Sequence, residues 1–313
     1  MAVQPKLIIH GGAGNSLKGK GGLLAVRESL HRIAAEIYAF LETGGSAVDA
    51  VILGAKLLED EPRFNAGTGS VVQSDGQIRM SAALMDGAAQ RFSGVINVMR
   101  VKNPIEIAEF LQTQTDRTLA DLGAAELVRE LQKPIYNPLT DLRLQEWMEE
   151  RKGNFESRMA GVVAEDEPES SARRGTIGVV ALDQTGKVAA ATSTGGKGLE
   201  RIGRVSDSAM PAGTYAMSGA AVSCTGIGED IIDECLAAKI VIRVTDGMTL
   251  AAAMQKSIAE STANQRDLGA IAIDASGNIV WGKTSEVLLA AYHDGAVLGD
   301  TLEWQMEPGV GSA

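Results

Sequence analysis

The side chains best suited to chemistry are concentrated between residues 175 and 226. Hydroxyl residues and glycines recur there at the ends of strand-like runs, and Arg204 and Asp207 lie between them in a glycine-flanked stretch. Each alone has an ordinary explanation, because threonine favours strands and Arg/Asp pairs are usually solvated. Together they could provide a nucleophile, hydroxyl donors, a cation for a substrate carboxylate and an anion for a substrate ammonium. The residues at strand ends are Thr176, Thr192, Ser193, Thr194, Ser223, Thr225 and Gly226.

Histidine is scarce, which argues against several common hydrolase mechanisms. His31 falls in an amphipathic helical pattern and His293 in a Tyr-His-Asp-Gly turn, so structural roles are expected for both. His10 precedes a glycine loop and could line a site, although a loop histidine satisfied by its neighbours is the simpler expectation. The sequence contains no Gly-x-Ser-x-Gly, His-Glu-x-x-His or Cys-x-x-Cys motif. A Ser-His-Asp hydrolase or a zinc enzyme therefore has little support.

A nucleotide-binding loop is the main competing interpretation. Residues 277–284 match Gly-x-x-x-x-Gly-Lys-Thr and follow a predicted strand. Such a loop directs backbone N–H groups at phosphate and needs small, turn-forming residues, whereas Ile279, Val280 and Trp281 favour a strand. Gly277 also matches the turn glycine of a predicted hairpin. A P-loop-type nucleotide-binding protein that uses this segment remains the alternative.

Composition and charge exclude several classes of partner. The chain has 313 residues, of which 45% are hydrophobic, and this is enough for a sizeable core. Its net charge of −11 would repel a polyanion, so no nucleic-acid partner is expected. The chain shows neither a run of 18 apolar residues nor a signal-peptide pattern, so we expect no membrane partner and a cytoplasmic location. Cys224 and Cys235 are too few for a disulfide framework, and reduced thiols are expected.

The elements that must position these residues can be predicted from periodicity and turn signals. Apolar positions with helical spacing alternate with strand–turn–strand patterns, and both kinds of element occur in groups. This arrangement predicts an α+β fold with helices layered on antiparallel sheets. A strand is expected at 6–9, running into a glycine loop at 10–14. Helices are expected at 22–42, 46–59, after Asn103-Pro104, around 119–131, at 228–245 and at 249–260, and hairpins at 69–78, 178–188 and 269–279.

Residues 151–174 differ from the rest of the chain. They are polar, charged and almost without periodicity, which predicts an exposed, mobile linker. A strongly strand-like run begins immediately afterwards, at Gly175-Thr176. The linker could simply join two domains, or it could serve a purpose connected with Thr176.

The combined motifs resemble the plant-type L-asparaginase and isoaspartyl peptidase family, within the N-terminal-nucleophile hydrolases. The resemblance covers most of the chain. It lies in IIHGGAG near the start, LLEDEPRFNAGTGSV at 57–71, MDG at 85–87, and the ordered tracts GTIG, TSTGG, GRVSDS and SCTG between 175 and 226. It implies a single domain of the αββα sandwich type over residues 1–313, cut between Gly175 and Thr176 into an alpha subunit, 1–175, and a beta subunit, 176–313. It also implies a homodimer of these two-fragment units.

The resemblance also implies roles for individual residues. Thr176 would be the nucleophile, with Thr194 beside it, in the hydrolysis of L-asparagine and of β-aspartyl (isoaspartyl) dipeptides. Arg204 and Asp207 would hold the substrate's α-carboxylate and α-ammonium. The oxyanion site would be formed by Thr225 and Gly226, with Asn65 nearby.

No cofactor is expected for catalysis, but the family resemblance implies a structural alkali cation such as sodium. In this family a loop matching residues 58–68 holds the ion through backbone carbonyls. The carry-over places the ligands at Leu58, Glu59, Glu61, Phe64, Ala66 and Thr68.

Two segments depart from the family pattern and bear on substrate range. Residues 81–84 are Ser-Ala-Ala-Leu where the family often has an Asp-Ala-Ser/Cys tract, and residues 197–202 lack the usual polar and proline pattern. Glycosylasparaginases resemble the chain around the same threonine and form a second alternative. They are generally exported and carry disulfides, which the two isolated cysteines do not favour.

The predicted cleavage suits the chemistry of a threonine nucleophile. A threonine hydroxyl needs a base, and no histidine is expected in the site. The α-amine of a chain terminus has a reference pKa of about 7.7–8.0, close to operating pH. Inside an intact chain the same nitrogen is an amide without basicity, so cutting before Thr176 would activate the enzyme.

Overall fold

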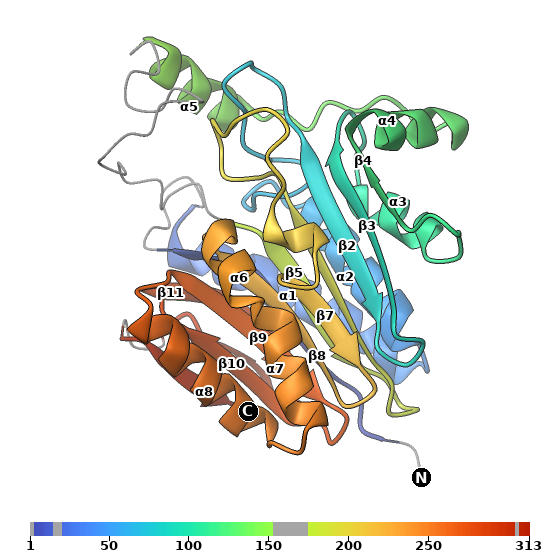
Figure 1. Cartoon of the computed structure of the whole chain (residues 1–313), viewed down its shortest axis with the longest axis vertical. Coiled ribbons are helices and arrows are strands. Elements are labelled where there is room, and N and C mark those ends of the chain that lie inside the picture. Colours follow the sequence, from blue (N-terminus) through green and yellow to red (C-terminus); the bar gives the residue numbers. More distant parts are fainter. Residues whose placement is uncertain (1–2, 15–20, 153–174, 304–306) are drawn as a thin grey trace.

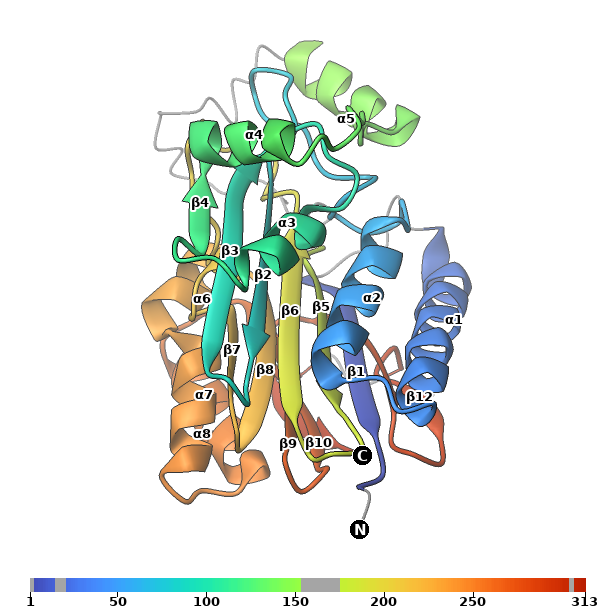
Figure 2. The same cartoon turned by 90° about the vertical axis from the view of Figure 1, so that its right-hand side faces the viewer.

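The protein is a sandwich of two β-sheets with helices on both outer faces. The computed structural model describes residues 3–14, 21–152, 175–303 and 307–313. Seen edge-on, helices, sheet, sheet and helices form four successive layers (Figures 1 and 2). This is the predicted αββα architecture, and the predicted grouping of helices and antiparallel strands is confirmed.

The larger sheet contains eight strands in the order β12-β11-β1-β5-β6-β2-β3-β4. Neighbouring strands are antiparallel, apart from β4, which runs parallel to β3. The strands are β1 (Lys6–Gly14), β2 (Met80–Asp86), β3 (Arg91–Val98), β4 (Thr118–Ala120), β5 (Ile177–Leu182), β6 (Val188–Thr194), β11 (Val287–His293) and β12 (Leu298–Asp300).

The smaller sheet has five strands in the order β13-β10-β9-β8-β7. All of them follow residue 213 in the sequence, so this sheet is built from the carboxyl-terminal part of the chain. The strands are β7 (Thr214–Met217), β8 (Ala220–Gly226), β9 (Leu268–Asp274), β10 (Ile279–Lys283) and β13 (Gly309–Ser312).

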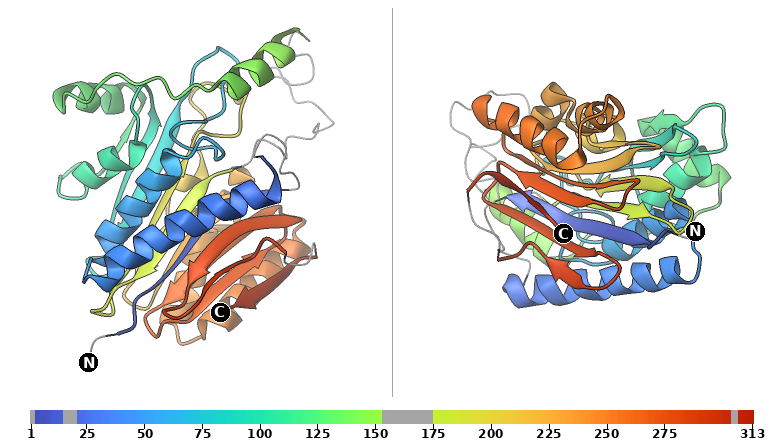
Figure 3. Two further views of the ribbon diagram at one scale, coloured as in Figure 1. Left: turned by 180° about the vertical axis from the view of Figure 1, so that it is seen from behind. Right: turned by 90° about the horizontal axis from the view of Figure 1, so that it is seen from below.

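The helices are divided between the two outer faces. Helices from the first half of the chain pack on the eight-stranded sheet, and those after residue 227 pack on the five-stranded sheet (Figure 3). The first group comprises α1 (Gly22–Glu42), α2 (Ala47–Glu59), α3 (Pro104–Leu111) and α4 (Asp121–Glu130). Helix α5 (Asp141–Lys152) is the exception: it lies beyond the end of the sheet, where Trp147 Nε1 donates to Gln73 O (Figure 1). The second comprises α6 (Gly228–Glu234), α7 (Leu236–Thr245) and α8 (Leu250–Ala263).

Alternating side chains explain why the two sheets face each other. Successive residues of a strand point to opposite faces. On β5, Val179 packs in the core beneath the helices, whereas Val180 packs between the sheets. On β9, Ile271 likewise enters the core between the sheets, while Ala270 faces the second helix layer. Strands β5 and β9 are therefore apolar on both faces along most of their length, as expected for strands that are covered on both sides.

Local signals fix several element boundaries as predicted. Ser46 caps α2 by accepting a hydrogen bond from the N–H of Asp49, and Thr249 caps α8 in the same way. The hairpins β5–β6 and β9–β10 turn at Gly186 and Gly277, both of which adopt positive φ.

Three local predictions need correction. The pattern at 69–78 contains the predicted turn, in which Gln73 N–H donates to Gln77 O, but the residues on either side are not strands: Gly69 N–H donates to Pro138 O, and Leu199 N–H donates to Val72 O. The expected glycine loop at 10–14 is part of β1, as an irregularity in its pairing with β11. The helical run 228–245 is broken at Cys235, which has a φ of 46°.

The nucleotide-binding interpretation of residues 277–284 is also wrong. Residues 279–283 form β10, which pairs with β9 and β13, so their backbone N–H groups lie in a sheet rather than in a phosphate-binding loop. Lys283 is buried and donates a hydrogen bond to the carbonyl oxygen of Glu286.

The remaining predictions concern the linker at 151–174 and membrane-spanning helices. The predicted linker lies outside the described residues, apart from Arg151 and Lys152, which end α5. In the described residues, no helix has both the length and the apolar character needed to cross a membrane.

Candidate active site

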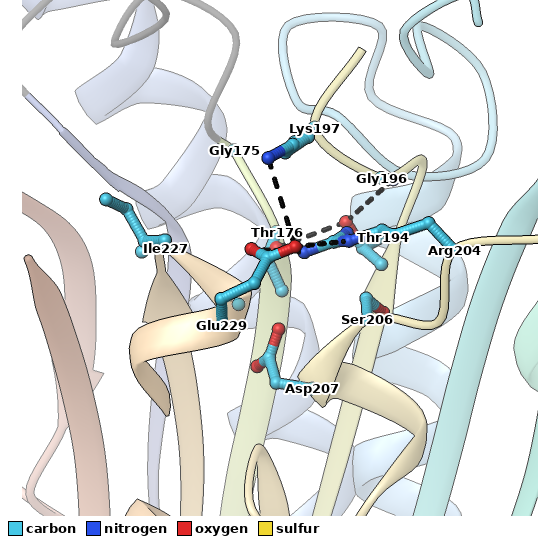
Figure 4. Close-up of a pocket in the computed structure, with 12 residues that line it drawn as sticks. Gly175, Thr176, Thr194, Gly196, Lys197, Arg204, Ser206, Asp207, Ile227 and Glu229 are labelled. Atoms are coloured by element: carbon cyan, nitrogen blue, oxygen red, sulfur yellow. Dashed lines mark hydrogen bonds and ion pairs between the residues drawn. The ribbon is translucent and has the colours of Figure 1, made fainter. Parts of the chain in front are cut away.

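Thr176 lies immediately before β5, opposite the end of β6. In this hairpin Ile177 pairs with Ser193, and extending the register by one residue places Thr176 across from Thr194. The Thr176 hydroxyl donates to Thr194 Oγ1 at 3.1 Å, and Gly196 N–H donates to the same oxygen at 3.1 Å (Figure 4). The predicted neighbour of Thr176 therefore holds its hydroxyl in place.

The Thr176 side chain belongs to a pocket at one end of the sandwich. Residues from both sheets contribute to it, together with the loops that follow β6 and β8. Two cations and two anions are among its lining residues, so the pocket as a whole carries balanced charge. The lining residues are Gly175, Thr176, Thr194, Gly196, Lys197, Arg204, Ser206, Asp207, Gly226, Ile227, Gly228 and Glu229.

Arg204 is paired with Glu229, a partner that the sequence analysis did not anticipate. Arg204 Nε and Nη2 donate to the two carboxylate oxygens of Glu229 at 3.0 Å each. Burial alone would lower the Arg204 pKa, but the hydrogen bonds and the charge of Glu229 raise it above its usual value. This pairing uses the Nε/Nη2 edge of the guanidinium and leaves the Nη1/Nη2 end for a second carboxylate.

Asp207 is a buried carboxylate in the pocket wall. Burial raises its pKa to about 7, although the charge of Arg204 acts in the opposite direction. Its Oδ2 is buried and has no hydrogen-bond partner within the described ranges. A Cβ on Gly228 would come within 2.8 Å of Asp207 Oδ1 and 2.5 Å of Arg204 Nη2. The close approach of the two side chains at this point therefore depends on glycine at position 228.

Thr225 and Gly226, the predicted oxyanion residues, lie at the end of β8, but only Gly226 is among the residues that line the pocket. Gly226 lines the pocket with φ +128°, and a Cβ there would lie 2.6 Å from Asp267 O. Thr225 is 1% exposed and lies outside the pocket lining. Its hydroxyl oxygen accepts a hydrogen bond from Ala13 N–H at 3.1 Å, which leaves the hydroxyl proton available to donate.

Asn65 connects the loop after α2 to both sides of Thr176. Its backbone N–H donates to the Gly175 carbonyl at 3.1 Å, and its backbone carbonyl accepts from Gly195 N–H at 2.9 Å. Its side chain donates to Gly196 O at 2.6 Å and accepts from Val71 N–H at 2.9 Å. It therefore contacts the bond predicted to be cut as well as the loop behind Thr194.

His10 is a contributor to the site whose role the sequence did not reveal. It is fully buried in β1, where Nδ1 lies 3.0 Å from Thr176 O and Nε2 lies 3.0 Å from Ser223 Oγ. Burial lowers the His10 pKa to about 3, so the ring is neutral near pH 7. Since a carbonyl only accepts, Nδ1 donates to Thr176 and Nε2 accepts from Ser223. The expectation of a satisfied histidine is correct, but what it holds is the backbone of Thr176.

The same buried network accounts for two of the other hydroxyl residues. Ser223 Oγ lies 2.7 Å from Thr192 Oγ1, so both side chains belong to the chain of hydrogen bonds that starts at His10. Neither lines the pocket. They stabilise the Thr176 backbone through His10 and do not reach the pocket where a ligand would bind.

The predicted cation loop has features that suit backbone-carbonyl ligands. Gly67 and Gly69 adopt positive φ, and a Cβ on either would overlap carbonyl oxygens of the loop, those of Glu59 and Pro62 respectively. A Cβ on Gly69 would also lie 3.0 Å from Phe64 O. Pro62 O and Phe64 O thus both lie beside Gly69, and oxygen is the donor that a hard cation prefers. The predicted donor set, Leu58, Glu59, Glu61, Phe64, Ala66 and Thr68, lies on this loop.

Comparison with known proteins gives a consistent result. A family model described as asparaginase matches residues 3–303. An isoaspartyl peptidase/L-asparaginase of a Nostoc species is 69% identical over 99% of this chain and 98% of that protein. A plant-type L-asparaginase of Pyrococcus horikoshii is 37% identical over 91% of this chain and 95% of that protein. An isoaspartyl peptidase/L-asparaginase of Bos taurus is 33% identical over 96% of this chain and 98% of that protein.

Proposed function

The chain belongs to the asparaginase family of N-terminal-nucleophile hydrolases, and we propose that it hydrolyses L-asparagine and β-aspartyl dipeptides with Thr176 as nucleophile. The observation that carries the proposal is the position of the Thr176 hydroxyl. It lies at the start of a central strand, in a pocket that also contains the guanidinium of Arg204 and the carboxylate of Asp207. The names of the relatives favour this activity over that of a glycosylasparaginase.

The charges of the pocket suit the α-carbon substituents of aspartyl compounds. Arg204 retains two donors at the end of its guanidinium for the α-carboxylate. Asp207 lies in the pocket wall with Oδ1 beside Gly228, and an α-ammonium brought against this carboxylate would lower the Asp207 pKa again. With both groups held, the side-chain carbonyl is the part of the substrate left to meet Thr176.

Self-cleavage between Gly175 and Thr176 is the proposed activation step. Thr176 Oγ attacks the Gly175 carbonyl carbon, the C–N bond breaks, and an ester forms while the nitrogen becomes an amine. Water then hydrolyses the ester and releases the Gly175 carboxylate. The N–H of Asn65 already donates to the Gly175 carbonyl, where it would stabilise the negative charge that develops on this oxygen. The residues preceding Thr176 can then leave the pocket.

The mature enzyme would carry out acyl transfer. The Thr176 amine takes the proton of its own hydroxyl as Oγ attacks the substrate carbonyl, and the amine later protonates the leaving nitrogen. Thr194 orients the hydroxyl until that transfer. Gly226 N–H and the Thr225 hydroxyl are the proposed donors to the oxyanion. Ammonia or an amino acid departs, and water cleaves the ester to free aspartate.

Mass spectrometry and activity assays on position 176 test this proposal. Wild type should yield fragments 1–175 and 176–313, together with asparaginase and β-aspartyl peptidase activity. Thr176→Ala should stay uncut and inactive because it lacks the nucleophile. Thr176→Ser retains a hydroxyl and should still cleave. Full activity from a chain that remains uncut would contradict the mechanism.

An alkali cation is proposed only as a structural ligand. Residues 58–68 would hold it through backbone carbonyls, and a bound ion would supply a fixed positive charge that stiffens the loop carrying Asn65. Catalysis needs no step at the ion. The homodimer remains a prediction from the family resemblance, and the cytoplasmic location remains a prediction from the sequence.

A further inference from the structure

Two charged side chains of the pocket, Lys197 and Glu229, have no part in the steps described above. We propose that Lys197 binds the carboxylate of the amino acid that leaves from a β-aspartyl dipeptide, and thereby makes such peptides preferred substrates. The inference rests on the proposed function and specifies it further. Lys197 lies in the segment 197–202, which departs from the family pattern.

The contacts of Lys197 leave its ammonium available to a ligand. Its nearest described partner is Glu229, with 3.9 Å between Nζ and Oε1, which is too long for a hydrogen bond. Glu229 is instead held by Arg204 at 3.0 Å through both oxygens. The Lys197 side chain is 51% exposed, so a ligand can reach it without displacing protein atoms.

The position of Lys197 corresponds to the leaving-group side of Thr176. In Figure 4, Asp207 lies on one side of Thr176, and Lys197 lies on the other, near Gly175. A substrate with its ammonium at Asp207 and its carbonyl at Thr176 would extend its leaving group toward Lys197. In a β-aspartyl dipeptide the second carboxylate is attached to the carbon next to the scissile nitrogen, so it falls on this side of the pocket.

The charge balance of the pocket supports the same assignment. L-Asparagine has one carboxylate and one ammonium, which match Arg204 and Asp207. A β-aspartyl dipeptide adds a second carboxylate, while Glu229 already contributes one to Arg204. Without Lys197 the second carboxylate would face Glu229 with no cation to compensate, and like charges repel. With Lys197 the bound dipeptide leaves the pocket with a net charge of −1, whereas without Lys197 the net charge would be −2.

The backbone on both sides of Lys197 is fixed, which makes the side chain a defined feature of the site. Gly196 and Gly198 have positive φ of 88° and 78°. Gly196 O accepts from the Asn65 side chain at 2.6 Å, and Leu199 N–H donates to Val72 O at 3.2 Å. The loop therefore presents Lys197 from anchored positions rather than from a free tip.

A pair of substrates isolates the contribution of the second carboxylate. β-Aspartyl-leucine carries it, and β-aspartyl-leucine amide does not. We compare the ratio of kcat/KM for the acid to that for the amide in wild type, Lys197→Met and Lys197→Arg. Arg201→Met is the matched control, because it removes an exposed cation of the same loop that does not line the pocket. Mass spectrometry confirms that each protein has matured.

The acid-to-amide ratio should fall in Lys197→Met by roughly 2- to 5-fold, the size expected for a half-exposed ion pair. Lys197→Arg and Arg201→Met should keep the wild-type ratio, and added salt should reduce that ratio in wild type. An unchanged ratio in matured Lys197→Met would overturn the inference, as would an equal loss on both substrates. Mature wild-type enzyme that hydrolyses neither peptide nor L-asparagine would instead overturn the proposed function itself.

Discussion

The ionisation of a single carboxyl group connects the structure of the pocket to its pH dependence. Burial raises the Asp207 pKa to about 7, so the group is protonated below that pH and ionised above it. Only the ionised form attracts an α-ammonium. Substrate capture should therefore weaken as the pH falls through about 7. The Thr176 amine, with a reference pKa of about 7.7–8.0, titrates in an overlapping range.

A comparison of two substrates separates the effect of Asp207 ionisation on activity from the effect of Thr176 amine ionisation. We expect the ratio of kcat/KM for L-asparagine to kcat/KM for succinamic acid, which lacks the α-amino group, to rise between about pH 6 and pH 8. The amine of Thr176 affects both substrates equally and cancels from the ratio. Asp207→Asn should make the ratio independent of pH. A flat ratio in wild type would mean that Asp207 does not bind the ammonium.

At the scale of single residues, the sequence predicted which residues line the pocket better than it predicted the partners of those residues. Thr176, Thr194 and Arg204 were predicted from motifs, and all three line the pocket. The pairing of Arg204 with Glu229 joins residues 25 positions apart and depends on how α6 meets the loop before Asp207. The contact from His10 to Thr176 spans 166 positions. No local pattern encodes either contact.

Between elements, the packing of β5 against β1 and β8 sustains the geometry of Thr176. Gly178 lies on β5, where a Cβ would overlap both Ser223 Oγ and His10 Nε2. Gly178→Ala should therefore displace His10 and Ser223 and weaken the hydrogen bonds that hold the Thr176 backbone. We expect a loss of about 1–3 kcal/mol in stability, as for other overpacked cores, and slower self-cleavage.

Thermal unfolding of uncut proteins measures this effect without interference from maturation. Gly178→Ala and a control, Gly123→Ala, are each made in the Thr176→Ala background. The control is Gly123→Ala in α4, where an added Cβ meets no atom within 4 Å. Removing a glycine from a helix should raise stability by about 0.5–1 kcal/mol. A Gly178→Ala protein with the same Tm as its parent would show that the site can relax around the extra methyl group.

The whole molecule should survive its own cleavage, because the two fragments alternate within one sheet. Strand β1, from the first fragment, lies between β5 and β11 of the second, and β2 pairs with β6. Separating the fragments would break these ladders and expose the core that they share. We expect residues 1–175 and 176–313 to co-elute in native size-exclusion chromatography, at the volume of uncut Thr176→Ala. Two separate peaks without denaturant would contradict the interleaved topology.

What the sequence determined by itself is the set of local elements and the motifs that single out Thr176 as the proposed nucleophile. Some signals depend only on residues that are neighbours in the sequence, so propensity and periodicity reveal them. Examples are the Ser46 helix cap, the turn glycines Gly186 and Gly277, and the apolar strands. The same local signals were misleading at residues 69–78, where strand-forming residues are held by loops that lie close only in the folded chain.

Only the tertiary structure decided how the pocket is assembled. Periodicity shows that a residue is buried but not what it is buried against, because that depends on how the two sheets stack. The stacking brings His10 against the Thr176 backbone and sets Glu229 against Arg204, and it places Lys197 in the lining of the same pocket. It also buries Thr225 and brings its hydroxyl oxygen to Ala13 N–H, from which it accepts a hydrogen bond. These contacts join residues that are distant in the sequence, and it is the packing of whole layers that fixes them.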